Sequence, residues 1–270
     1  MRIIVVGPGR AAMSLATAFN NAGHQIVGLL GRGDPTPQIE ALGADWLAWD
    51  APLPSADLLL LGVRDDAIAE VAARLAPVAG NVTAAVHLSG SLTISVLEPL
   101  AGAGLSIGGF HPLQSLPDPA VGAKRLPGSW AGITADSPET AHQLFKLAES
   151  IEMFPFELAD EVRPLYHAGA SVAANYLVAN LALAQRLFAG AGVPWEAARP
   201  LVEAATENLD QLGPEAALTG PIARGDVDTV RDQLTAIRRA VPESEQDFID
   251  IGKAVARLAG REDEFEEVWE

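Results

Sequence analysis

The sequence contains no cysteine, which excludes disulfides, thiolate metal sites and cysteine nucleophiles. Basic residues are also scarce: 18 Lys and Arg stand against 35 Asp and Glu, giving a net charge of −17. Without a basic tail or stripe, binding to nucleic acid or to an anionic membrane is disfavoured. The 5 histidines are dispersed, so no metal site is predicted.

Long hydrophobic runs are missing as well. No apolar segment approaches the ~20 residues that a membrane span requires. Met1 and Arg2 lead directly into IIVVG, without the apolar core and cleavage site of a signal peptide. We therefore expect a cytoplasmic protein with no membrane segment. Hydrophobic residues make up 49% of the 270 residues, and this length favours two domains.

Short apolar segments alternate with helical patterns in the first part of the chain. This alternation predicts an α/β fold with a Rossmann-type, mostly parallel sheet and helices on both faces. The expected strands lie at residues 2–7, 24–31, 44–49, 56–63, 81–90, 105–110, 130–135 and 153–158. The Pro/Gly-rich stretch 112–128 is expected to be a loop.

Strand signals stop near residue 160. A long helix is predicted from about Pro164 to Ala191, and three more helical patterns follow it. We therefore expect one α/β domain at residues 1–160 and one all-α domain at residues 161–270.

A glycine-rich turn follows the first expected strand and opens the first helix. The segment GPGRAA fits the GxGxxA pattern, in which glycines permit a tight turn and a close approach to a pyrophosphate. The helix N-terminus directs N–H groups at the anion. We assign this role to Gly7, Pro8, Gly9, Arg10 and Ala11, with Ala12 allowing close helix–strand packing. The alternative is a tight turn in a fold that binds no nucleotide.

Arg32 stands at the end of the second expected strand, where a protein that uses NAD usually has an acidic residue. A guanidinium can bind the 2′-phosphate of NADP, so NADP is favoured over NAD. After the fourth strand, Val63 and Arg64 are expected beside the cofactor. Asp65 and Asp66 are expected only to cap the next helix.

Two further segments end strands on the same rim. In HLSGS, Ser89 and Gly90 are candidates for the nicotinamide pocket, while Ser91 is a candidate helix cap. In FHPLQSLP, His111 is expected in a turn before Pro112, with its ring facing a substrate. A histidine bonded only to loop backbone is the alternative.

The long predicted helix carries a polar stripe. His167, Ser171 and Asn175 follow one another at intervals of four residues, so an α-helix places them along one face. They line either a ligand cleft or a polar network in a packed core. Farther along, Asp226 is expected to cap a helix, in a compact loop whose Thr219, Gly220 and Arg224 are candidates to contact a ligand or a partner subunit.

These motifs resemble a bacterial Rossmann-like family whose C-terminal helical domain has no known function. The resemblance rests on GPGRAA, HLSGS, HPLQSLP, YHAGASVAANY and ALTGPIARGD. The wider superfamily includes β-hydroxyacid dehydrogenases, ketopantoate reductase, pyrroline-5-carboxylate reductase and prephenate dehydrogenase. The resemblance implies a C-terminal helical domain like that of 6-phosphogluconate dehydrogenase and NAD(P)-dependent hydride transfer. It also implies that residues 161–270 bind the substrate and form the interface of a homodimer.

One departure concerns the catalytic lysine of the β-hydroxyacid dehydrogenases and ketopantoate reductase. Asn175 matches the asparagine that follows this lysine, but the lysine position is Ser171, and the lysines of the chain are Lys124, Lys146 and Lys253. His167, one turn earlier, is the natural substitute as general acid. Ser171 and Asn175 would then orient a carbonyl, and His111 would bind or polarise it.

The leading hypothesis is thus an NADP-dependent oxidoreductase of a small oxo or hydroxy acid, with a 2-oxo acid such as ketopantoate as the specific candidate. One alternative is an NADP(H) sensor without catalysis, which the missing lysine motivates. Another is a dimerising scaffold that has lost its nucleotide, which the intact glycine pattern argues against.

Overall fold

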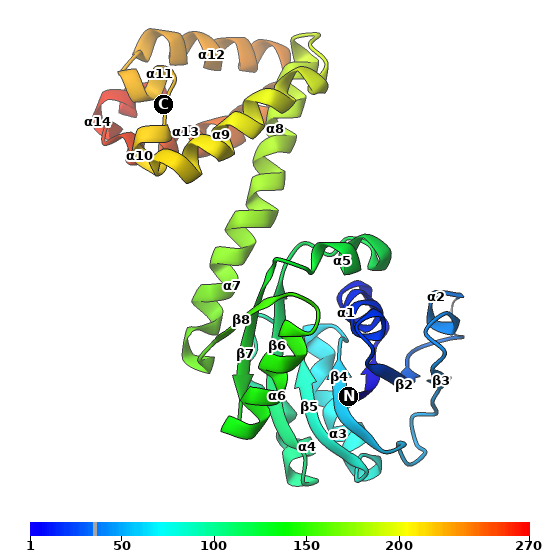
Figure 1. Cartoon of the computed structure of the whole chain (residues 1–270). Helices are drawn as coiled ribbons and strands as arrows, with labels where there is room; N and C mark the ends of the chain where they lie inside the picture. Colours follow the sequence, from blue (N-terminus) through cyan, green and yellow to red (C-terminus); the bar gives the residue numbers. More distant parts are fainter. Residues whose placement is uncertain (35–36) are drawn as a thin grey trace. The chain divides into compact units, whose positions relative to one another are not determined.

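The computed structural model describes residues 1–34 and 37–270 (Figure 1). The chain divides into two compact units, Met1–Ser171 and Val172–Glu270. The division falls inside the expected long helix rather than before it, because the helix begins with residues that bond to the sheet of the first unit. The functional roles expected for residues 1–160 and 161–270 stay predictions.

The first unit is built on one eight-stranded sheet in the order β3-β2-β1-β4-β5-β6-β7-β8. The strands are β1 Arg2–Val6, β2 Gln25–Leu30, β3 Asp45–Trp46, β4 Ala56–Leu61, β5 Val82–His87, β6 Ser106–Leu113, β7 Trp130–Ala135 and β8 Phe154–Glu157. Neighbouring strands are parallel except β6 and β7, which are antiparallel. The expected mostly parallel sheet is confirmed, although the third strand is shorter than expected.

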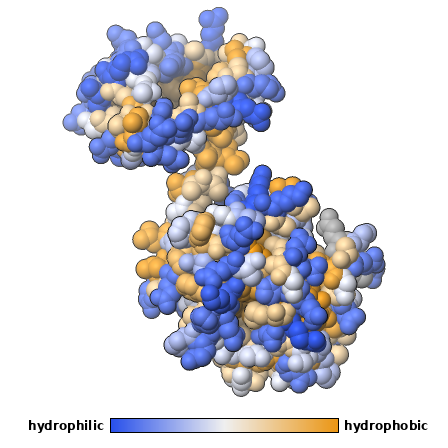
Figure 2. All heavy atoms as spheres, viewed as in Figure 1, coloured by the Kyte–Doolittle hydropathy of each residue, from blue (hydrophilic) through white to orange (hydrophobic). Residues whose placement is uncertain are grey.

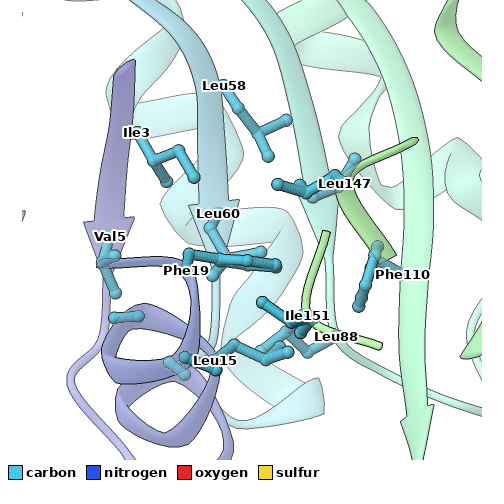
Figure 3. Close-up of a cluster of buried hydrophobic side chains, with 14 of the residues drawn as sticks. Ile3, Val5, Leu15, Phe19, Leu58, Leu60, Leu88, Phe110, Leu147 and Ile151 are labelled. Atoms are coloured by element: carbon cyan, nitrogen blue, oxygen red, sulfur yellow. The ribbon is translucent and has the colours of Figure 1, made fainter. Parts of the chain in front are cut away.

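Helices cover both faces of this sheet. They are α1 Arg10–Asn21, α2 Pro37–Glu40, α3 Ile68–Leu75, α4 Glu98–Gly102, α5 Pro119–Arg125, α6 Pro138–Glu149 and α7 Arg163–Ser171. Because side chains alternate along a strand, Ile3 and Val5 pack in one buried cluster with Phe19 of α1 (Figure 3). Ile4 and Val6 belong to the opposite cluster, together with residues of α3.

The predicted loop at 112–128 is wrong in two respects. Strand β6 continues to Leu113, so His111 lies within a strand and not in a turn. Farther along, α5 forms because the Asp118 side chain accepts hydrogen bonds from the first-turn N–H groups and Pro119 occupies the first helical position. A local capping signal therefore prevailed over the Pro/Gly-rich composition.

The second unit, Val172–Glu270, is entirely helical, as expected. It contains a π-helical turn Val172–Tyr176, followed by α8 Leu177–Gly190, α9 Arg199–Leu212, α10 Pro214–Ala217, α11 Pro221–Arg224, α12 Val227–Ala240, α13 Glu245–Ala259 and α14 Glu262–Phe265. Its core includes Val230, Ala256 and Phe265. Asp226 caps α12 by accepting bonds from Thr229, which confirms the predicted cap.

Among the described residues, none of the helices has both the length and the apolar character needed to cross a membrane.

Candidate functional site

The glycine turn after β1 has the geometry of an anion cradle. Gly7 adopts φ +77°, and a Cβ there would lie 2.5 Å from the Cγ1 atom of Val63. Both the positive φ and this collision exclude a larger residue. Gly9 precedes α1 in an extended conformation, and no side chain caps the helix. The first N–H groups of α1 are therefore available to an anion. Ala12 packs against Gly62, where a Cβ would lie only 2.3 Å from the Ala12 Cβ.

A pocket of about 450 Å³ opens beside this turn. Its lining brings together most of the predicted cofactor residues: Gly7, Pro8, Gly9, Arg32, Val63 and Arg64. Arg10 and Ala11 are not in the lining and contribute the start of α1 instead. Their assignment to the cofactor stays a prediction.

Sequence reasoning missed several residues of this pocket, among them Trp49 and Arg74. The Arg74 guanidinium carbon lies 4.9 Å from the centre of the Trp49 ring, a cation–π arrangement. The indole N–H of Trp49 donates to the carbonyl of Gly31 at 3.0 Å, which fixes the ring beside the end of β2. No spacing in the sequence connects these two residues, because only the fold of the sheet brings them together.

The expected capping role of Asp65 and Asp66 is wrong. Asp66 forms a two-bond pair with Arg64, with Nε–Oδ1 at 3.1 Å and Nη2–Oδ2 at 2.9 Å. Asp65 accepts from the hydroxyl of Ser89 at 2.6 Å and from that of Ser91 at 3.2 Å. Both carboxylates thus bond to side chains rather than to helix N–H groups, and no side chain caps the turn that begins at Asp65.

Ser89 is buried, and its hydroxyl is fully engaged. It also accepts from the backbone N–H groups of Ser91 and Leu92, at 3.2 and 3.1 Å. Ser89 therefore caps this turn. The helix cap expected of Ser91 is wrong, because the next helical segment, Ile94–Leu97, has Thr93 at its N-cap position and no side-chain cap. A cofactor role for Ser89 would have to use its backbone rather than its hydroxyl.

A second cluster lies on one face of β6 and β7. His111 of β6 faces Gly132 of β7 across the antiparallel pair, and Gly109 faces Thr134. The His111 Nδ1 atom lies 2.7 Å from the Tyr166 hydroxyl of α7, and the two rings are nearly perpendicular. Tyr166 was not predicted as a site residue.

The structure brings Gly90, His111 and His167 together; their predicted roles toward cofactor and substrate stay predictions. A Cβ at Gly90 would lie 2.7 Å from both the Nε2 of His111 and the Cδ2 of His167. The two histidine rings are 6.1 Å apart at their centres. A residue larger than glycine at position 90 would therefore collide with both imidazole rings.

Arg163, the first residue of α7, is fully buried and was also missed by the sequence reasoning. Its Nε donates to Asp160 at 3.0 Å, its Nη1 to the Ser89 carbonyl at 3.0 Å, and its Nη2 to the Thr134 hydroxyl at 2.7 Å. Asp160 also accepts from the Ile94 N–H. One guanidinium therefore joins the start of α7 to the HLSG turn and to β7.

Burial shifts the titration of this cluster. Burial and, to a lesser degree, the charges of His167 and Arg163 lower the pKa of His111 to about 4. Burial and Arg163 lower the pKa of His87 to about 4 as well, with smaller opposing effects of the Thr93 backbone and Asp65. Neither nitrogen of His87 makes a hydrogen bond of ordinary geometry among the described residues. Burial raises the pKa of Tyr166 to about 12.

The predicted polar stripe is regular only in its first half. His167 and Ser171 lie one turn apart in α7, but Asn175 lies in the π-helical turn Val172–Tyr176, where the spacing of an α-helix does not apply. Asn175 is exposed and belongs to the second unit. The roles of Ser171 and Asn175 stay predictions.

Residues 129–255 match the family model described as Domain of unknown function (DUF2520). This match confirms the resemblance to a family with a C-terminal domain of unknown function. A comparison with curated proteins found no match.

Solved structures with the same fold span nearly the whole chain. The Bacteroides fragilis protein BF3122, which carries the name of an NADP oxidoreductase, superposes with a TM-score of 0.80 at 23% identity over 95% of this chain and 98% of its own. Protein TM1727 from Thermotoga maritima gives 0.69 at 22% identity over 97% and 99%. A reductive aminase from Aspergillus terreus, in complex with NADPH and ethyl-5-oxohexanoate, gives 0.66 at 19% identity over 98% and 99%. The likeness extends the fold assignment to both units.

Proposed function

We propose that the protein is an NADP-dependent oxidoreductase that transfers hydride to or from a small oxo or hydroxy acid. The observation that carries this proposal is the pocket beside the uncapped N-terminus of α1, which three arginines line. Arg32 is our candidate for the 2′-phosphate, because the guanidinium of Arg64 is paired with Asp66 and that of Arg74 with Asp50. The similar Bacteroides fragilis protein bears the name of an NADP oxidoreductase, and the Aspergillus reductase holds NADPH, which supports the same cofactor here.

The residues present fit such a cofactor. Gly7 holds the turn tightly against Val63, which a Cβ would strike, and the uncapped first N–H groups of α1 are the donors that a pyrophosphate would use. Trp49 and Arg74 form a flat wall of the pocket that suits a purine ring. When bound, NADPH would supply a hydride. Arg32 would hold the 2′-phosphate, which NAD lacks.

The cluster around Gly90 supplies the groups for proton transfer. We assign His167 as general acid and base, because the pKa of His111 lies near 4 and its ring is neutral at pH 7. His111 then binds or polarises the substrate without carrying charge. Ser171 and Asn175 orient the carbonyl in this scheme, in place of the lysine that the resembling dehydrogenases use.

For the substrate we propose a 2-oxo acid of the ketopantoate type, which rests on the family resemblance. The test is NADPH oxidation by the purified chain with ketopantoate, other 2-oxo acids and cyclic imines, with NADPH and NADH binding titrated in parallel. Turnover that disappears in His167→Ala supports the proposal. Normal turnover in that variant removes His167 from the scheme, and failure to bind either nucleotide contradicts the proposal as a whole.

A second candidate function is a non-catalytic NADP(H) sensor, favoured by Ser171 at the position of the catalytic lysine. It predicts NADPH binding without turnover across the whole panel. The assay of NADPH oxidation and binding described above therefore distinguishes the two functions.

We further propose that the chain forms a homodimer through its helical unit. Large apolar side chains stand exposed on α8 and α9, among them Val178 at 68% and Leu201 at 66% exposure. Apolar surface is visible over α8 in Figure 2. Patches of this kind mark association surfaces. Light scattering after size-exclusion chromatography should give twice the 28.2 kDa chain mass, and a monomer would contradict this proposal.

A further inference from the structure

The packing of the fold does not by itself require the contact between Tyr166 and His111. Tyr166 is half-buried in the first turns of α7, and its hydroxyl lies 2.7 Å from Nδ1 of His111. The other ring nitrogen, Nε2, is the atom that a Cβ at Gly90 would approach to 2.7 Å. One nitrogen of His111 is thus bound to a tyrosine, while the other lies against Gly90, next to the His167 ring.

A glycine on β6 makes room for a side chain of α7 beside His111. Gly109, two residues before His111, leaves the space that the Arg163 guanidinium fills, because a Cβ there would collide with Nη2. Gly132 lies directly opposite His111, and a Cβ there would meet Leu158 at 3.0 Å and Phe156 at 3.3 Å before the Tyr166 hydroxyl at 3.4 Å. Gly109 therefore admits Arg163 to the face of the sheet that carries His111.

The charges around His111 favour a neutral ring. Arg163 and His167 act against a positive charge on it, Asp65 acts weakly in favour, and burial outweighs them all. Tyr166 keeps its proton at neutral pH, since burial raises its pKa. A neutral imidazole that accepts at one nitrogen must carry its proton on the other.

We propose that Tyr166 is a positioning residue: its hydroxyl donates to Nδ1 and holds His111 in the tautomer that carries the proton on Nε2. His111 then presents a fixed, uncharged N–H donor beside Gly90, aimed at the oxygen of a bound carbonyl. This inference rests on the proposed oxidoreductase function.

A neutral donor suits the chemistry of carbonyl reduction. Negative charge grows on the oxygen as the carbon receives a hydride, and an oriented N–H stabilises that charge without giving up its proton. The proton that completes the alcohol comes from His167, the general acid proposed above. His111 and His167 thus divide polarisation and proton transfer between them.

The direct test is ¹⁵N NMR of the histidine rings in the full chain without added ligand, which distinguishes the two neutral tautomers. The 5 histidines can be assigned through single His→Gln variants. We expect the His111 ring to be protonated on Nε2 from pH 6 to 8, and Tyr166→Phe to convert it to a mixture of tautomers. The chain has only 2 tyrosines, so Tyr176→Phe, which removes the same atom from an exposed side chain, is the matched control. A wild-type ring protonated on Nδ1, or a spectrum unchanged in Tyr166→Phe, overturns the proposal.

Kinetics supply the second readout. With any substrate that the wild type reduces, Tyr166→Phe should lower kcat about 10-fold, the value of one ordinary hydrogen bond, and leave the Kd of NADPH unchanged. Tyr176→Phe should leave both unchanged. If the wild type reduces nothing in the panel, the proposed function fails while the NMR result still decides the tautomer. If the wild type is active and Tyr166→Phe matches it in kcat, the positioning role fails alone.

Discussion

Replacing Arg163 by methionine tests how the first unit holds its second cluster together. Methionine keeps the length and apolar stem of the side chain but removes the guanidinium. The Ser89 carbonyl, the Thr134 hydroxyl and the Asp160 carboxylate each lose a donor that lies within 2.7 to 3.0 Å in the wild type. Asp160 is the most costly of these losses, because its charge is left beside the sheet with only the Ile94 N–H as partner.

The magnitude follows from burial. Arg163 has 0% exposure and Asp160 25%. Breaking a buried ion pair by removing one partner costs about 3–5 kcal/mol, and the partial exposure of Asp160 places the expected loss near the lower limit, at ~3 kcal/mol. A domain of this kind is stable by roughly 5–15 kcal/mol, so the variant should still fold.

Hydrogen exchange measured by mass spectrometry is the suitable assay, since it reports on the two units separately. In Arg163→Met, amides of β5, β6 and β7 should exchange about 100-fold faster, while amides of α12 and α13 serve as an internal reference and keep their rates. Lys146→Met is the matched control: it removes a cation from an i,i+3 pair of 2.8 Å in which both side chains are exposed. That pair should contribute about 0.5 kcal/mol or less. If exchange of β5 to β7 is no faster in Arg163→Met than in the control, Arg163 does not hold this cluster.

Three other predictions concern the two clusters. Gly90→Ala should lower kcat about 100-fold or more, because its Cβ would collide with two histidine rings. The control Gly80→Ala, with no atom within 4 Å of the added carbon, should fold and act normally. Equal activity of the two variants would refute the steric argument. Arg32→Ala should raise the Kd of NADPH about 10-fold with little effect on NADH, measured by fluorescence titration; a parallel loss for both would show that Arg32 does not recognise the 2′-phosphate. The free energy of unfolding should fall as pH drops from 7 to 5, by about 2 kcal/mol for each of His87 and His111. Both are neutral in the folded chain, with pKa values of about 4, but take up protons near 6.5 when unfolded. Urea unfolding of His87→Leu should show a smaller pH-dependent fall in this free energy, and an identical fall would contradict this assignment.

The parts of the fold that follow from local pattern were predictable. Apolar strands that are buried on both faces gave continuous runs such as ADLLLL, and their alternation with helices fixed the parallel sheet. The glycine turn was also predictable, because the positive φ of Gly7 leaves few other residues possible. The end of β6 was not, since His111 and Pro112 owe their strand conformation to pairing with β7 and not to propensity.

The candidate site divides in the same way. Gly90 and His111 could be placed on one rim because both segments end apolar strands, whereas His167 was predicted only on the polar face of the long helix. Tyr166 and Arg163 could not be identified, since their partners, His111, Ser89 and Thr134, lie on strands and turns far from them in the sequence. Asp65 was misassigned as a cap because its hydroxyl partners, 24 and 26 residues away, leave no local signal.

The most direct test of the central claim is a titration of the purified wild-type chain with NADPH and with NADH, followed by energy transfer from tryptophan to the nicotinamide. Trp49 lines the pocket and should report on both nucleotides. We expect saturable binding of NADPH that is at least about 10-fold tighter than that of NADH, the difference expected for a guanidinium pair with the 2′-phosphate. Equal affinities would contradict the role of the arginines, and failure of both nucleotides to bind would contradict the pocket, the glycine turn and the proposed function together.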